Sequence, residues 1–150
     1  MTQDRPIRPM TSADIDQCIE IGRASGLSYW SRESFADELA RSDSIALVAR
    51  SGEKVAGFVV GRFIESEKIA EIYNIGVRLD SKREGVGRQL LVSFEERSRK
   101  QDVNSIWLEV RASNSSAIAF YRNAEFSQMS VRKGFYANPP EDAILMSKKL

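Results

Sequence analysis

The sequence predicts a single α/β or α+β domain in which helices cover a mixed, mostly antiparallel sheet. Its 150 residues are sufficient for one well-formed core and leave little room for a second, so we assign residues 1–150 to one domain. Runs of β-prone residues alternate with amphipathic helical segments along the chain. Residues 45–50, 55–63 and 69–79 are consecutive β-prone runs, which is typical of antiparallel strands.

The composition is that of an ordinary soluble globular protein, with 42% hydrophobic and 29% charged residues. The net charge of +1 gives no support to general binding of nucleic acid or of an anionic membrane. No apolar run approaches the roughly 20 residues needed to span a bilayer, and residues 1–6 lack the apolar region of a signal peptide. We therefore expect a cytoplasmic protein with no membrane or nucleic-acid partner.

Histidine is absent, and cysteine occurs once, as Cys18. The chain therefore cannot form an internal disulfide, and it lacks the groups of Ser-His-Asp and Cys-His nucleophile systems. A zinc site would lack its usual ligands, so we expect no metal. Any catalysis must rely on carboxylates, tyrosine or backbone groups.

Residues 6–10 predict a short first strand, followed by a helix that is capped by Thr11 or Ser12 and ends at Gly26. Cys18 lies on the apolar stripe of this helix and is expected to be a small core residue rather than a nucleophile. The stripe follows the i, i+3, i+4, i+7 spacing and consists of Ile15, Cys18, Ile19 and Gly22.

A linking segment at residues 27–30 is expected to expose two aromatic side chains before a second helix begins. Ser31 caps that helix, and Phe35, Leu39 and Ala36 are expected to face inward.

The β-prone runs 45–50 and 55–63 are separated by Ser51-Gly52-Glu53-Lys54, which predicts a hairpin. In the third run, Gly76 occupies the interior of a strand. A glycine there indicates a β-bulge or the close approach of another chain or a ligand.

A third helix is predicted from about Val86, and its charged residues 95–100 are expected to face solvent. The strand that follows, residues 105–110, is apolar enough to be buried on both faces. The apolar face of the helix consists of Val86, Leu90, Leu91 and Phe94.

A fourth helix, capped by Ser113 or Asn114, is predicted to end at about Asn123. Two last strands close the chain and are joined by a loop. These strands are residues 126–133 and 143–147, and the loop is residues 134–140.

The loop between the third strand run and the third helix has the composition of an anion-binding turn. Gly85 and Gly87 allow a sharp turn, and the helix that follows begins with unpaired backbone N–H groups and the positive end of its dipole. It is neither a P-loop nor a dinucleotide fingerprint, because the lysine of the first and the third glycine of the second are missing. The alternative is a tight turn with solvated charges. Basic residues around the loop favour an anion: Lys82, Arg83 and Arg88.

Glu109 is a carboxylate in an otherwise apolar strand. By strand alternation, Leu108 and Val110 should share one face, and Trp107 and Glu109 the other. Burying a carboxylate raises its pKa, so that it can act as a general base near neutral pH. The alternative is an edge position with the carboxylate in solvent, which the apolar neighbours make the less favoured interpretation.

Tyr121 lies on the apolar stripe of the fourth helix, one turn beyond Ala117 and Ile118. An aromatic there is commonly a core residue with its hydroxyl at the boundary. Its position favours a functional role, because its helix directly follows the strand that carries Glu109.

Several segments together resemble one known family. They are the run Trp-Leu-Glu-Val-Arg-Ala-Ser-Asn at 107–114, and residues 30–31, 74–77, 85–88, 117–119, 121 and 141–146. These segments resemble the acetyl-CoA core of the GNAT N-acetyltransferases, specifically the RimI-type ribosomal-protein alanine N-acetyltransferases. The resemblance implies a six- to seven-stranded GNAT sheet flanked by about four helices.

The resemblance also implies roles for individual residues. Glu109 would be the general base, and Tyr121 the acid that protonates the leaving thiolate and touches the cofactor. Trp30 and Tyr136 would help hold the substrate's first residue. Acetyl-CoA would be held at the bulged strand, at the glycine loop and at the fourth helix, by Ile75, Gly76, Val77, Lys82, Arg83, Glu84, Gly85, Val86, Gly87, Arg88 and Asn114.

Two positions depart from the family pattern. Lys82 stands where Gln or Arg is usual, which matters little if backbone N–H groups hold the pyrophosphate. Glu125 replaces a glycine after the fourth helix, and Asn123 is expected to supply the left-handed cap instead.

The implied reaction is transfer of acetyl from acetyl-CoA to the α-amino group of a protein N-terminus that starts with Ala or Ser, on a ribosomal protein, with CoA released. An α-amino group has a pKa of about 7.7–8.0 and lysine one near 10.4. Deprotonating the first at pH 7 costs on the order of 1 kcal/mol, for which one carboxylate acting as a base is adequate, without a metal. We expect the amine to attack acetyl-CoA directly in a ternary complex. We expect a monomer or weak dimer.

Two other interpretations remain open. One is a GNAT enzyme for lysine side chains or a small amine such as a polyamine or an antibiotic. The other is a non-catalytic CoA-binding module, which the presence of both Glu109 and Tyr121 disfavours.

Overall fold

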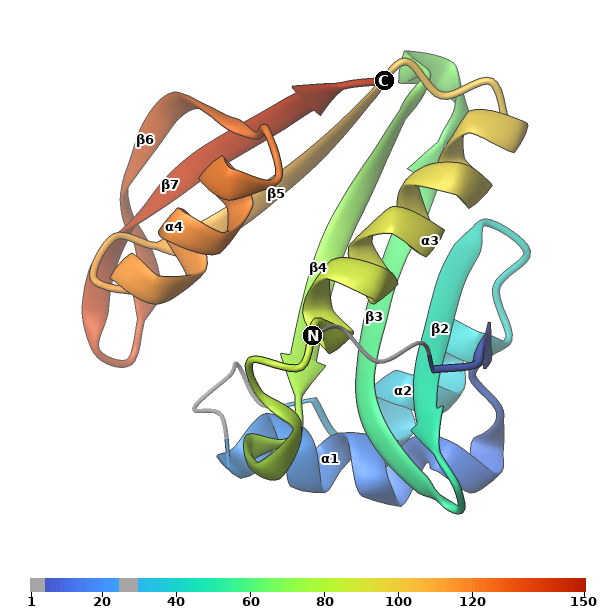
Figure 1. Cartoon of the computed structure of the whole chain (residues 1–150). Helices are drawn as coiled ribbons and strands as arrows, with labels where there is room; N and C mark the ends of the chain where they lie inside the picture. Colours follow the sequence, from blue (N-terminus) through green and yellow to red (C-terminus); the bar gives the residue numbers. More distant parts are fainter. Residues whose placement is uncertain (1–4, 25–29) are drawn as a thin grey trace.

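A computed structural model describes residues 5–24 and 30–150 (Figure 1). The predicted end of the first helix at Gly26 and the exposed Tyr29 lie outside these residues. The helices in the described part are α1 (Ile15–Ala24), α2 (Arg32–Leu39), α3 (Val86–Lys100) and α4 (Ser115–Asn123), with 3-10 turns at Ser12–Asp14, Glu65–Glu67 and Leu79–Ser81. The strands are β1 (Ile7–Pro9), β2 (Ser44–Ser51), β3 (Lys54–Ile64), β4 (Ile69–Val77), β5 (Ser105–Arg111), β6 (Ser127–Ala137) and β7 (Pro140–Lys149).

The strands form one seven-stranded sheet in the order β1-β2-β3-β4-β5-β7-β6. The pairs are antiparallel except β4 and β5, which are parallel because α3 connects them. The predicted mixed, mostly antiparallel sheet and the hairpin of β2 and β3 are therefore confirmed. No helix within the described ranges is long and apolar enough to cross a bilayer.

Helices cover both faces of the sheet (Figure 1). On one face, α3 and α4 close a core whose largest buried members include Leu90, Phe94 and Ile106. On the other, α1 and α2 pack Cys18 and Phe35 against β2 and β3. Burial raises the pKa of the Cys18 thiol to about 12, as suits a core residue.

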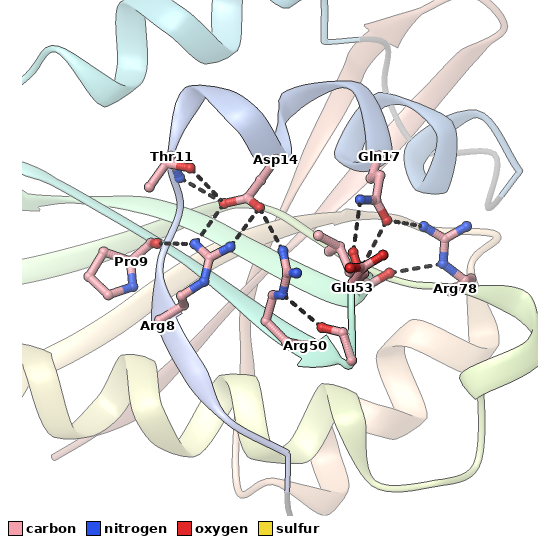
Figure 2. Close-up of polar contacts among 10 residues, drawn as sticks. Arg8, Pro9, Thr11, Asp14, Gln17, Arg50, Glu53 and Arg78 are labelled. Carbon is pink, nitrogen blue, oxygen red and sulfur yellow. Dashed lines mark hydrogen bonds and ion pairs between the residues drawn. The ribbon is translucent and has the colours of Figure 1, made fainter.

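Hydrogen bonds and ion pairs anchor the start of α1 to the sheet (Figure 2). The buried Asp14 carboxylate accepts hydrogen bonds from Arg8 (2.8 Å) and Arg50 (3.3 Å), and also from the backbone N–H of Thr11 (2.8 Å). Burial alone would raise the pKa of Asp14, but the hydrogen bonds from Arg8 and Thr11 outweigh it and hold the pKa below its usual range. Thr11, one of the two predicted caps, thus precedes a 3-10 turn that leads into α1.

Two buried carboxylates change the predicted helix faces. In α2, Phe35 and Glu38 are buried, whereas Ala36 is exposed. Glu38 can be buried because its carboxylate pairs with Arg62 of β3 at 2.7 Å. In α3, Glu95 is buried beside Lys148 at 2.8 Å, so the prediction that the charged residues of 95–100 face solvent is wrong for Glu95. Each buried carboxylate is stable because a cation from a distant strand reaches it.

Smaller corrections concern α1 and the strands. In α1 the fully buried positions are Ile15, Cys18 and Ile21, whereas Ile19 is partly buried against the same core and Gly22 is half-buried. β5 is buried on alternate residues rather than on both faces. The predicted loop 134–140 is largely strand, since β6 continues to Ala137.

α4 ends in a Schellman motif, with the N–H of Glu125 bonded to the C=O of Arg122 and that of Phe126 to the C=O of Tyr121, both at 2.9 Å. Glu125 takes the left-handed position with φ +75°, so the prediction that Asn123 does so is wrong. Asn123 is the last helical residue instead. The same motif packs the ring of Phe126 against Tyr121, with centroids 5.6 Å apart.

Replacing Glu125 with glycine should stabilise the fold by about 1 kcal/mol, since glycine adopts a positive φ without the penalty of a Cβ. The Glu125 side chain is 82% exposed and its oxygen is 3.9 Å from Lys148 Nζ, so little is lost with the charge. The melting temperature should rise by about 2–4 °C. Glu125→Ala, which removes the charge but keeps the Cβ, should give no such gain; equal gains in both variants would contradict the interpretation.

Candidate active site

The parallel pairing of β4 with β5 is short. It joins Ile69–Ile72 with Ser105–Leu108 and then stops, although β4 continues to Val77 and β5 to Arg111. Beyond the last pair the two strands separate (Figure 1). Over the second half of β4, the edge that faces β5 therefore makes no β-sheet hydrogen bonds with it.

The extra residue that bends β4 is Tyr73. Val60 of β3 pairs with Asn74, and the next residue, Gly61, pairs with Ile72, which leaves Tyr73 unmatched. The bulge, one of the two alternatives that Gly76 indicated, thus lies three residues earlier. The predicted cofactor-binding residues Ile75, Gly76 and Val77 follow the bulge on the part of β4 that has separated from β5; their other edge pairs with β3.

The glycine loop leads from β4 into α3. Arg83 has φ +67° and Gly85, the N-cap of α3, has φ +80°, so two left-handed residues turn the chain into the helix. Such turns direct successive backbone N–H groups to one side, where the helix dipole adds to their attraction for an anion. Lys82, Arg83 and Arg88 are exposed around this turn. The loop also carries a carboxylate, Glu84, which is ion-paired with Arg5.

Arg78 fixes the start of this loop (Figure 2). Its guanidinium donates to the C=O of Val55 at 2.9 Å, to Gln17 Oε1 at 3.0 Å and to Glu20 at 2.9 Å. Gln17 Oε1 also accepts the N–H of Val55 at 2.8 Å. The loop is therefore tied to β3 and α1 before it reaches Gly85.

Gly87 permits close packing between α3 and α4. A Cβ there would lie 3.3 Å from the ring of Phe120 in α4, tighter than an ordinary contact. Asn114 caps α4, with its side-chain oxygen accepting the N–H of Ala117 at 3.1 Å. The loop residues and Asn114 thus lie at the beginnings of two helices that pack on the same face of the sheet.

Glu109 lies just beyond the last β4–β5 pair, on the face opposite Leu108 and Val110, as strand alternation predicts. One carboxylate oxygen, Oε1, accepts a hydrogen bond from Arg132 at 3.0 Å. The other, Oε2, is buried and has no hydrogen-bond partner in the described part of the chain. Burial raises the pKa of Glu109, Arg132 opposes that rise, and Glu71 adds to it.

Tyr121 is buried on the opposite face of the sheet, among the residues of the α3–α4 core. Its ring packs edge-on against Phe120 and Phe126, with centroids 5.3 and 5.6 Å away. Burial, with a smaller effect from Tyr136, raises the pKa of its phenol, which therefore stays protonated at neutral pH.

The two predicted substrate contacts, Tyr136 and Trp30, have different neighbours in the structure. Tyr136 of β6 stacks under the guanidinium of Arg111, 4.2 Å from its ring centroid, and burial and the charge of Glu109 raise its pKa. Trp30 packs on Phe35 and lines an open pocket of about 440 Å³, which Tyr136 does not line. Other residues around that pocket are Ser34, Asp37, Glu38, Arg41, Arg62 and Tyr73.

Arg132, Glu71 and Tyr73 were not predicted as site residues. Arg132 reaches Glu109 across β7, because Arg132 pairs with Ala143 and Glu109 with Leu145. Only the register of three strands reveals that proximity. Among the described residues no group of three or more His, Cys, Asp or Glu is placed to hold a metal ion.

Comparison with known proteins identifies the family of this chain. The acetyltransferase (GNAT) family matches residues 15–126, and the chain belongs to this family of acetyl-CoA-dependent N-acetyltransferases. It is 32% identical over 143 residues to the ribosomal protein bS18-alanine N-acetyltransferase of Escherichia coli K12, covering 94% of this chain and 95% of that protein.

One further relative and one solved structure extend the comparison. An N-alpha-acetyltransferase of Saccharolobus solfataricus is 31% identical over 160 residues, with 99% of this chain and 95% of the relative covered. The crystal structure of the ribosomal-protein-S18-alanine N-acetyltransferase from Escherichia coli superposes with a TM-score of 0.86 at 29% identity, covering 97% of this chain and 94% of that one.

Replacing Gly85 with alanine should weaken CoA binding about 5–30-fold, because a Cβ at φ +80° costs about 1–2 kcal/mol and the loop will relax away from its binding conformation. Titration calorimetry with CoA measures the effect. Gly52→Ala is the matched control: Gly52 also has a positive φ, +64°, but lies in the β2–β3 turn. Unchanged CoA affinity in Gly85→Ala would show that the turn does not hold the cofactor.

Proposed function

We propose that this enzyme transfers the acetyl group of acetyl-CoA to the α-amino group of a protein N-terminus. The observation that carries the proposal is Glu109, a carboxylate with one buried, unpartnered oxygen at the point where β4 and β5 separate. The family membership supports the acetyl donor. Acetyl-CoA, when bound, supplies the acetyl thioester and the thiolate leaving group.

The residues present fit a CoA ester in extent and in charge. The N–H groups at the start of α3, with Lys82, Arg83 and Arg88 around them, suit its pyrophosphate. The separated edge of β4 from Ile75 to Val77 offers backbone groups for the pantetheine amides. Glu84 and Val86 belong to the same turn, and Asn114 opens the neighbouring helix α4.

Glu109 and Tyr121 suit complementary proton transfers. They lie on opposite faces of the sheet, so a thioester between the separated strands would have the carboxylate on one side and the phenol on the other. Glu109 Oε2 accepts the proton of the attacking amine, directly or through one water. Tyr121 Oη donates a proton to the leaving thiolate, and its raised pKa keeps that proton available. Attack is direct, within a ternary complex.

An α-amino group is the amine that one carboxylate can best activate. Its pKa of about 7.7–8.0 leaves an appreciable neutral fraction at pH 7, whereas lysine, near 10.4, requires more than about 4 kcal/mol. The names of the relatives support a substrate that begins with Ala, or with the similarly small Ser, on a ribosomal protein. In this proposal Tyr136 and Trp30 hold the first residues of that chain, and the enzyme works in the cytoplasm as a monomer or weak dimer.

A specificity assay tests the substrate class. Acetyl-CoA is offered with Ala- and Ser-starting peptides, with the same peptides Nα-blocked but carrying lysine, and with polyamines, and product is quantified by mass spectrometry. We expect acetylation at the free α-amino group of the peptides. Preference for the blocked lysine peptides or the polyamines would overturn the proposed substrate.

Replacing Glu109 with glutamine should lower kcat about 10²–10⁴-fold, because the general base is lost while the shape is kept. Tyr121→Phe should lower it less, about 10²-fold, since a thiolate is a good leaving group. CoA affinity, followed by calorimetry, should stay within about twofold for Glu109→Gln. Full activity in both variants would refute the assigned roles even if the reaction itself were correct.

A further inference from the structure

We propose that Arg132 is a positioning residue for the general base: by holding Glu109 Oε1, it directs Oε2 to the reacting amine and keeps the carboxylate ionised. This inference rests on the proposed function, in which Glu109 accepts the amine proton. It assigns a role to β6, the outermost strand of the sheet next to β7.

The two oxygens of Glu109 are in different situations. Oε1 is 3.0 Å from a terminal nitrogen of Arg132, and the bond comes from that one nitrogen rather than from a bidentate fork. Oε2 is buried with no partner among the residues the structure describes. Since Arg132 occupies Oε1, Oε2 is the oxygen left to accept the proton of the amine, directly or through one water.

The position of Arg132 is fixed by the sheet. Arg132 pairs with Ala143 of β7, and Glu109 pairs with Leu145 of the same strand, so one strand and two residues separate them. The guanidinium also lies 5.4 Å from the ring centroid of Phe135, a second contact that restricts its orientation. Its side chain is 55% exposed, so its charge is partly hydrated and its effect on Glu109 is moderate.

The charges around Glu109 come from β4 and β6. Burial and the carboxylate of Glu71 raise the pKa of Glu109, and Arg132 is the cation that opposes them. Tyr136 also faces this group, since the charge of Glu109 raises the pKa of its phenol. Without Arg132, burial and Glu71 would act unopposed, so less of Glu109 would be ionised near neutral pH. A cation beside the carboxylate also disfavours the ammonium form of the substrate amine.

The test compares Arg132→Gln with Lys133→Gln. Lys133 is the adjacent residue, carries the same charge, is 85% exposed and pairs with Asp142 instead of Glu109. The pKa of Glu109 is read from the ¹³C shift of its side-chain carboxyl during a pH titration of the free enzyme, with the resonance assigned by its loss in Glu109→Gln. This readout does not depend on the substrate.

In Arg132→Gln the pKa of Glu109 should rise by about one unit, the lower end of the range for a neighbouring opposite charge. The acidic limb of kcat/KM for an Ala-starting peptide should move up in parallel, and the rate below that limb should fall about tenfold. Arg132→Lys, which keeps the positive charge, should show smaller shifts of the Glu109 pKa and of the acidic limb. Lys133→Gln should move neither the Glu109 pKa nor the acidic limb. The substrate amine also titrates, but it does so equally in all variants and does not affect the comparison.

An unchanged Glu109 pKa in Arg132→Gln, or an equal change in Lys133→Gln, would overturn the inference. A raised pKa in an enzyme that acetylates no N-terminal peptide would instead uphold the pairing of Arg132 with Glu109 and refute the proposed substrate. The two failures are therefore distinguishable.

Discussion

The short parallel pairing between β4 and β5 is the constraint on which the site depends. The two strands pair over four residues each, Ile69–Ile72 with Ser105–Leu108, and the bulge at Tyr73 then turns β4 away. If the two strands stayed paired, their backbone N–H and C=O groups would bond to each other, and none would be free to bind a ligand between the strands. Because they separate, the β4 edge after Tyr73, the start of α3 and Glu109 all follow the last β4–β5 pair along their segments. We propose that together they form the site.

The surrounding contacts hold this opening in shape. Arg78 ties the end of β4 to β3 and α1, and Gly87 lets α3 pack closely against Phe120 of α4. The Schellman motif after α4 fixes Tyr121, through its carbonyl and its contact with Phe126. A residue with an unfavourable backbone conformation, Glu125, persists there because these contacts determine the turn.

The sequence predicts the regular elements well and the long-range pairs poorly. Periodicity identified the β2–β3 hairpin, α3 with its face of Val86, Leu90, Leu91 and Phe94, and the alternation that separates Glu109 from its apolar neighbours. It missed the burial of Glu38 and Glu95, because their partners lie 24 and 53 residues away in the chain. The bulge at Tyr73 and the reach of Arg132 to Glu109 depend on strand register, which no local pattern contains.

The most direct test of the account is a crystal structure of the enzyme with CoA joined covalently to an Ala-starting peptide through an acetyl bridge. The account predicts that the pyrophosphate lies on the backbone N–H groups from Arg83 to Arg88, and that the pantetheine arm follows β4 beyond Tyr73. The peptide nitrogen should lie within hydrogen-bonding distance of Glu109 Oε2 or of one bridging water. A bridged ligand whose nitrogen lies on the Tyr121 side of the sheet, away from Glu109, would contradict it.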